Sequence, residues 1–307
     1  MRIIINTILI FFISILDLFA QNLVDKDYVQ VLGIIQDAGF PHIGCERDCC
    51  NSDTIQEFYV SSLGLIDKKN QKRYLFDATP NLTEQIRELE IFPKNKKIID
   101  GIFLTHAHIG HYTGLMYLGR EALGAKNIDV YAMERMNNYL KNNGPWSQLV
   151  ELNNIFLNKI HNYKAVNISQ NLKVIPFTVP HRDEFSETVG YKIISKSKSI
   201  LFIPDIDKWN QWEKSIINEI KLVDFALIDG TFYNGTELDR DMSEIPHPSV
   251  EETIELFLNE PVSERNKIYF IHINHTNPIL SNKNNILKNV KSLGFNIAKR
   301  GMKFYLD

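Results

Sequence analysis

The chain has 307 residues, of which 44% are hydrophobic and 23% are charged, and its formal net charge is −3. This composition is that of an ordinary globular protein, long enough to bury a substantial core. No basic run or basic half stands out, so the charge gives no case for a nucleic-acid partner, and we expect a small-molecule substrate.

The first 20 residues have the layout of a secretory signal peptide. Arg2 precedes an apolar run of Ile, Leu and Phe that ends at Ala20. A membrane-anchoring first helix is the alternative, but Asn6 and Asp17 interrupt the run, which is also short for a span. We therefore expect a signal peptide at 1–20, export to a bacterial periplasm or to the outside, and no membrane span after cleavage.

The rest of the chain shows no repeat, low-complexity tract or flexible linker, which predicts a single domain at 21–307. Strand-like runs lie at 28–35, 58–66, 73–76, 101–104, 128–131, 173–179, 189–194, 200–203, 225–228, 268–271 and 298–305. Helix-like segments lie at 82–91, 113–123, 209–220, 250–258 and 285–293. The pattern predicts an α/β fold in which two sheets pack face to face with helices outside.

Several of these strand-like runs end abruptly in His or Asp. The runs are Ile102-Phe-Leu-Thr-His106, Phe177-Thr-Val-Pro-His181, Leu201-Phe-Ile-Pro-Asp205, Ala226-Leu-Ile-Asp229 and Tyr269-Phe-Ile-His272. Side chains at neighbouring strand ends converge on one edge of a sheet, where a rigid scaffold can hold metal ligands. These residues are therefore predicted to share one site.

The segment Thr105-His-Ala-His-Ile-Gly-His-Tyr-Thr-Gly114 places three histidines close together. Alternate residues of an extended backbone share a face, so His106 and His108 can reach one ion, while the following turn carries His111 toward a neighbouring position. A solvated histidine-rich loop is the alternative. The apolar run in front of the cluster favours a metal site.

This segment resembles the His-x-His-x-Asp-His signature of the metallo-β-lactamase superfamily, and the other strand-end residues follow in the expected order. The resemblance implies a four-layer αββα sandwich of two mixed sheets, and a metal-dependent hydrolase that uses metal-activated water. It implies a first metal on His106, His108 and His181, a bridging Asp205, a second metal on His111 and His272, and Asp77 as the residue that orients the metal loop. We expect one or two zinc ions there, although the same ligands accept iron or manganese.

The chain departs from that signature at Gly110, which replaces the aspartate. A second ion would then be held by the two remaining histidines, the bridging aspartate and water, or would not bind. Asp37, in the loop after the first strand, is a candidate replacement, but we expect it to serve as a turn residue. Asp207 is expected to cap the following helix, which leaves Asp205 as the ligand.

Three cysteines, Cys45, Cys49 and Cys50, lie in one short loop. An odd number at this spacing is poor material for disulfides, so metal ligation is the preferred interpretation and reduced surface thiols are the alternative. A closed tetrahedral zinc site needs a fourth ligand, for which His42 and His275 are candidates.

The cysteine loop narrows the resemblance to a subgroup that contains the coenzyme PQQ synthesis protein B family and the phosphodiesterase of the carbon-phosphorus lyase pathway. The resemblance covers nearly all of the chain after residue 20. It implies that His272 serves the active site, while His275 joins the three cysteines in a structural zinc site.

The resemblance to related enzymes of the superfamily implies that His247 donates a proton to the leaving group and that Asp229 is its acidic partner. An ordinary turn histidine between two prolines is the alternative. The expected reaction is hydrolysis of a small phosphodiester or a cyclic ester. Iron-dependent oxidation chemistry of a PQQ-biosynthesis kind and a catalytically weak metal- or ligand-binding protein are the alternatives, and a homodimer is compatible with the sequence.

Overall fold

The computed structural model describes residues 26–51, 58–92, 97–238, 245–281 and 285–307. The signal peptide expected at 1–20 lies outside these residues and stays a prediction. Among the described residues, no helix is both long enough and apolar enough to cross a membrane.

The first sheet follows the order β14-β1-β2-β3-β4-β5-β6 in the described part of the chain. Its strands are β1 (Tyr28–Gly33), β2 (Ser62–Asp67), β3 (Lys72–Phe76), β4 (Gly101–Phe103), β5 (Ile128–Ala132), β6 (Ile155–Lys159) and β14 (Lys303–Tyr305). The pairs from β14 to β3 are antiparallel, whereas those from β3 to β6 are parallel. The sheet is therefore mixed.

The second sheet follows the order β13-β12-β11-β10-β9-β8-β7 and is also mixed. Its strands are β7 (Val166–Asn167), β8 (Lys173–Thr178), β9 (Val189–Ile194), β10 (Ser199–Ile203), β11 (Phe225–Asp229), β12 (Ile268–Ile271) and β13 (Asn296–Ile297). The pairs from β10 to β13 are parallel and those from β7 to β10 are antiparallel.

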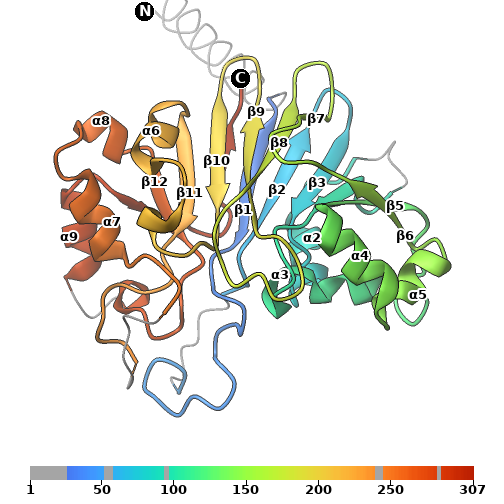
Figure 1. Ribbon diagram of the computed structural model, residues 1–307, viewed down its shortest axis with the longest axis horizontal. Helices are drawn as coiled ribbons and strands as arrows, with labels where there is room; N and C mark the ends of the chain where they lie inside the picture. Colours follow the sequence, from blue (N-terminus) through green and yellow to red (C-terminus); the bar gives the residue numbers. More distant parts are fainter. Residues whose placement is uncertain (1–25, 52–57, 93–96, 239–244, 282–284) are drawn as a thin grey trace, which may run out of the picture.

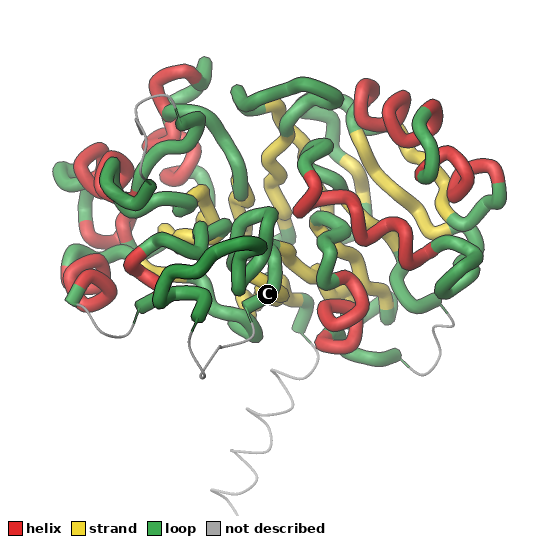
Figure 2. The backbone as a smooth tube through the Cα atoms, turned by 90° about the horizontal axis from the view of Figure 1, so that it is seen from below, coloured by secondary structure: helices red, strands yellow, loops and turns green. Residues whose placement is uncertain are grey.

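Helices cover the outer faces of both sheets (Figures 1 and 2). Beside the first sheet lie α2 (Leu82–Glu88), α3 (Ile109–Tyr112), η1 (Thr113–Leu118), α4 (Glu134–Asn142) and α5 (Trp146–Glu151). With the second sheet lie η2 (Trp209–Gln211), α6 (Ile216–Lys221), α7 (Val250–Phe257), α8 (Val262–Arg265), η4 (Pro278–Leu280) and α9 (Ile286–Ser292). The predicted αββα sandwich of two mixed sheets is confirmed.

The pleat of the strands explains how the layers are held together. The ring of Phe76 on β3 lies 5.3 Å from that of Tyr191 and 6.1 Å from that of Phe202, both in the second sheet. The preceding residue, Leu75, points the other way and packs in a cluster with Leu82 of α2. The strand β3 thus contributes to two apolar layers, which fix its end in space.

Some local predictions are wrong. The helix expected at 113–123 is the short 3₁₀ segment η1, which ends at Gly119 in an extended conformation. The helix expected at 209–220 is divided into η2 and α6, because Ser215 starts a new helix by accepting a hydrogen bond from the backbone N–H of Asn218. Several short elements lie outside every predicted segment, namely β6, β7, β13, α3, α4, α5, α8 and η4.

Candidate active site

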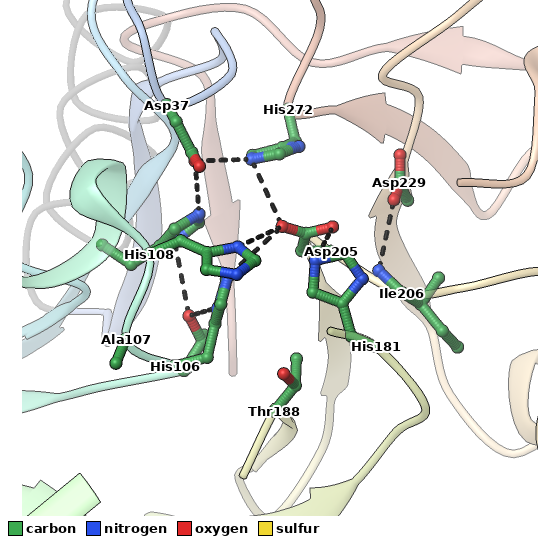
Figure 3. Close-up of polar contacts among 12 residues, drawn as sticks. Asp37, His106, Ala107, His108, His181, Thr188, Asp205, Ile206, Asp229 and His272 are labelled. Atoms are coloured by element: carbon green, nitrogen blue, oxygen red, sulfur yellow. Dashed lines mark hydrogen bonds and ion pairs between the residues drawn. The ribbon is translucent and has the colours of Figure 1, made fainter. Parts of the chain in front are cut away.

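Strand ends from both sheets bring the predicted ligands together. His106 follows β4 of the first sheet, while His181, Asp205 and His272 follow β8, β10 and β12 of the second. Figure 3 shows the carboxylate of Asp205 between imidazoles contributed by the two sheets. The cluster therefore spans the interface between the two sheets, and both must fold for it to form.

One group of potential ligands consists of His106, His108, His181 and Asp205, with one ligand atom of each within 4.8 Å of the others. Asp205 Oδ2 lies 3.3 Å from Nε2 of His106, and Asp205 Oδ1 lies 3.2 Å from Nε2 of His181. This is the set that the resemblance implied for a first metal.

A second group shares Asp205 and adds His111, His272 and Asp37. Asp37 Oδ1 lies 2.9 Å from Nε2 of His111 and 3.3 Å from Nε2 of His272. Asp37 does lie in a turn, as its residue type favours, but the expectation that it serves only there is wrong because its carboxylate reaches the cluster.

The two groups fit a divalent cation. Among the described residues, Nε2 of His106, His111 and His181 and Nδ1 of His108 are buried and make no hydrogen bond, although carboxylate oxygens lie within 4 Å of each. Buried polar atoms are normally hydrogen-bonded. Unpaired nitrogens that converge on shared carboxylates are the donor set expected for zinc or a similar ion.

The electrostatics of the cluster also favour a cation. Burial, with His111 nearby, holds the pKa of His106 well below its usual value, which keeps this ring in the neutral form that binds metals. Burial alone would raise the pKa of Asp205, but the surrounding imidazoles, His181 first among them, hold it well below its usual value. Asp205 is therefore an anion in the centre of the cluster.

Asp77 fixes the histidine loop from behind, which is the orienting position implied for it. Its carboxylate accepts hydrogen bonds from the backbone N–H of Thr105 at 2.7 Å and from the Thr105 hydroxyl, and it lies 2.7 Å from Nδ1 of His111. Because Nδ1 is engaged, His111 presents Nε2 to the cluster. Asp77 itself has a positive φ of 69°, as His272 has one of 63°, so the backbone is strained at two site residues.

Three further residues orient ligands and were missed by sequence reasoning. Asp207 Oδ1 lies 3.0 Å from Nδ1 of His181, and the segment after it has no side-chain cap, so its predicted capping role is wrong. The Thr231 hydroxyl lies 2.9 Å from Nδ1 of His272, and Glu184 lies 3.2 Å from Nε2 of His108. The order of residues along the chain gives no signal for these pairs, apart from the acidic character of Asp207 and Glu184.

His247 lies beside the cluster with its predicted partner. Its Nδ1 is 2.8 Å from Asp229 Oδ2 and 3.2 Å from Asp205 Oδ1. Burial favours the neutral ring, but Asp229 and Asp205 outweigh it and raise the pKa of His247. His247 also lines a cavity of about 300 Å³ with Phe232 and Ile245. An imidazole that holds its proton more tightly than usual thus borders a space that can admit a small ligand.

The cysteines gather with His275 in a separate cluster. Sγ of Cys49 lies 3.9 Å from that of Cys45 and 3.8 Å from that of Cys50, and the ligand atoms of all four residues lie within 4.8 Å of one another. Burial, with His42 and Arg47 nearby, lowers the pKa of His275 to about 4, so its ring is neutral. Nδ1 of His275 has no hydrogen-bond partner among the described residues, which suits a tetrahedral ion.

His42, the other candidate for a fourth ligand, is placed differently. Its ring stacks on that of His275 with centroids 4.1 Å apart, and its Nδ1 lies 2.8 Å from the carbonyl oxygen of Ile43. The ligand group found among the described residues contains His275 and not His42. The geometry therefore favours His275.

The family model of the β-lactamase superfamily domain matches residues 72–273, well over half of the chain. The chain belongs to this superfamily. The matched segment includes every active-site residue discussed above except Asp37.

Curated relatives narrow the similarity to the predicted subgroup. Coenzyme PQQ synthesis protein B of Methylococcus capsulatus is 23% identical over 314 aligned residues, covering 91% of this chain and 99% of the relative. The protein of the same name from Gluconobacter oxydans is 25% identical over 312 residues, covering 91% and 98%. The predicted resemblance to this family is confirmed.

Solved structures give the same fold. Zn²⁺-bound PqqB from Methylobacterium extorquens has a TM-score of 0.75 at 20% identity, covering 90% of this chain and 99% of that one. A diphosphatase of the PhnP family has a TM-score of 0.63 at 23% identity, covering 91% and 97%.

Proposed function

We propose that this chain is a metal-dependent hydrolase that acts on a small phosphodiester or a cyclic ester. The observation that carries the proposal is the position of His247, which is held by Asp229 next to the ligand cluster and borders the cavity of about 300 Å³. The superfamily contains hydrolases that act on phosphate compounds, such as the PhnP-family diphosphatase, so this substrate class suits the fold.

In the proposed mechanism, the strand-end ligands would hold one or two zinc ions, with iron or manganese as alternatives. A bound ion would supply Lewis acidity, which polarises the phosphoryl or carbonyl oxygen of the group under attack and activates water near neutral pH. Asp77, Asp207 and Thr231 keep the ligand imidazoles in fixed orientations and tautomers.

His247 would hold the proton that the leaving group needs. Its Nδ1 faces Asp229, so the proton on Nε2 is the one available for a substrate in the cavity. Asp229 also accepts hydrogen bonds from the backbone N–H groups of Thr231 and Ile206, at 2.9 Å and 3.2 Å. These contacts fix the carboxylate in place, which holds the imidazole of His247 in one orientation.

The test uses zinc-loaded protein and bis-p-nitrophenyl phosphate. His247→Asn should lower kcat by about 10²- to 10⁴-fold, the usual contribution of a general acid, without loss of bound metal. His161→Ala, at an exposed histidine, is the matched control and should leave kcat unchanged. If His247→Asn and His108→Ala both kept the wild-type rate, the phosphodiesterase proposal would be wrong.

Iron-dependent oxidation chemistry is the second candidate, because the PQQ synthesis relatives align with 91% of the chain. Imidazole and carboxylate ligands accept iron as well as zinc. Metal analysis of protein purified without added metal separates the two candidates. Iron together with oxygen-dependent turnover would favour oxidation, whereas zinc together with phosphodiester turnover would favour hydrolysis.

We also propose that the protein is exported, with a mature chain that begins near Gln21. The support is the layout of the first 20 residues. The mass of the protein recovered from its native host tests this, since the full-length mass would contradict cleavage.

A further inference from the structure

Gly110 stands where the superfamily signature has a carboxylate, and the structure shows what fills that space. A Cβ atom built on Gly110 would lie 2.5 Å from Cα of Asp37 and 2.6 Å from its Oδ1. No real Cβ tolerates these distances. The loop after β1 therefore occupies the volume that a side chain at position 110 would need, and it brings a carboxylate there.

The contacts of Asp37 are those of a ligand. The same oxygen, Oδ1, approaches Nε2 of His111 at 2.9 Å and Nε2 of His272 at 3.3 Å (Figure 3 labels Asp37 and His272). Both imidazoles use Nδ1 elsewhere, toward Asp77 and the Thr231 hydroxyl respectively. Their Nε2 atoms are therefore directed toward one carboxylate, and each ring is held in place from its other side.

The backbone around Asp37 is tied to the backbone around His272. The N–H of Gln36 donates to the carbonyl of Ile273 at 3.0 Å, and the N–H of Ile273 donates to the carbonyl of Ile34 at 2.7 Å. The amide of Asn274 also donates to Oε1 of Gln36. The residues that precede Asp37 are thus hydrogen-bonded to the residues that follow His272, and these bonds hold the two side chains close together. A residue needed only for a turn would not require these links.

We propose that Asp37 is the carboxylate ligand of the second cation position, taking over from the absent aspartate at position 110. The second ion is then held by Asp37, His111 and His272, with Asp205 shared between the two positions. This inference rests on the proposed function only in that the cluster binds metal, and it concerns the number of ions rather than the reaction.

The experiment titrates Co²⁺ into metal-free protein and counts bound ions, using thiolate-to-cobalt absorbance to separate the cysteine cluster. In the wild type, two of the bound ions should give no thiolate-to-cobalt absorbance, because they occupy the strand-end cluster. Asp37→Ala should take up one, and Asp37→Asn, which keeps the shape of the side chain, should bind the second ion at least about 10-fold more weakly.

Gly110→Ala gives a test that removes no ligand. Its methyl group must displace the loop at Asp37, so this variant should also lose the second ion. The matched control is Gly144→Ala, because a Cβ there meets nothing within 4 Å and the count should stay at two. Far-ultraviolet circular dichroism confirms that each variant is folded.

Wild-type stoichiometry and affinity in both Asp37 variants would overturn the inference, as would a wild type that binds only one ion outside the cysteine cluster. The proposed function would survive either result, since one ion and His247 suffice for it. Conversely, a loss of the second ion in Asp37→Ala would support the inference even if bis-p-nitrophenyl phosphate were not a substrate.

Discussion

The two clusters of potential ligands are built in different ways. The strand-end cluster draws its residues from both sheets, and His106, His111, Asp205 and His272 are each at most 2% exposed. The cysteine cluster lies mainly in a loop at 41–50 that contains neither helix nor strand, with Cys45 and Cys49 partly exposed. One cluster is part of the core, whereas the other is attached to it.

The two clusters differ in what holds their side chains in place. In the strand-end cluster, apolar packing and carboxylates such as Asp77 hold the imidazoles before any ion arrives. In the cysteine cluster, the thiols contact one another and the N–H of His42, so these thiol contacts alone offset little of the entropy lost on ordering the loop. We therefore expect metal loss to affect activity at the first cluster and stability at the second.

The largest effect on activity should follow removal of the shared carboxylate. Asp205→Ala deletes a group that lies within 4 Å of five imidazoles, those of His106, His108, His181, His247 and His272. Phosphodiester turnover and metal affinity should fall by more than the roughly 10- to 100-fold typical of orienting residues.

The control for Asp205→Ala is Asp224→Ala, because Asp224 pairs with Lys198 before the start of β11, away from both clusters, and its removal takes away the same charge. Circular dichroism should show a folded Asp205→Ala protein, since the sheets hold this cluster. Global unfolding of that variant would contradict the idea that the cluster is preorganised without metal.

Loss of a thiol should act on stability instead. Cys49→Ser removes a sulfur that lies within 4 Å of those of Cys45 and Cys50, so an ion bound there would be lost along with much of its contribution to folding. The Tm should fall by several degrees, and chelation should lower the Tm of the wild type more than that of the variant. An unchanged Tm would show that the thiols are simply reduced and bind nothing.

A smaller effect is expected at Asp207, which acts through His181. Asp207→Asn keeps an oxygen near Nδ1 of His181 but removes the charge, so metal affinity should fall by about 10- to 100-fold while the Tm of the metal-free protein stays the same. Comparing isothermal metal titrations for this variant and Asp224→Asn, which breaks a more exposed ion pair with Lys198, checks the prediction. If the two variants bound metal with equal affinity, Asp207 would have no role in orienting His181 for metal binding.

The convergence of the strand-end residues could be predicted because they end apolar runs, and parallel strands such as β10, β11 and β12 must end at one edge. It could not predict the place of Asp37. That residue is remote from His111 and His272 in the chain, and turn chemistry already explained its type. The prediction for Asp207 was wrong for the same reason. An aspartate that caps a helix and one that orients a histidine cannot be told apart in the sequence when the partner, His181, is distant in the chain.

The smallest effect concerns Asp27, which precedes β1 and lies apart from both clusters. Burial, with Asp67 and Asp307 nearby, raises its pKa from 3.8 to about 6, although its carboxylate accepts a hydrogen bond from the N–H of Lys68. Between these pH values the folded state binds more protons than the unfolded state, so stability falls as the pH rises from about 4 to 6 and stays lower above that. Asn accepts the same hydrogen bond without the charge. Asp27→Asn should therefore raise the Tm by about 2 °C at pH 7.5 and leave it unchanged at pH 4, whereas a gain of the same size at both values would assign the effect to packing.

Because this change touches neither cluster, it should leave metal stoichiometry and turnover as they are, which separates a general gain in stability from effects that need the ions.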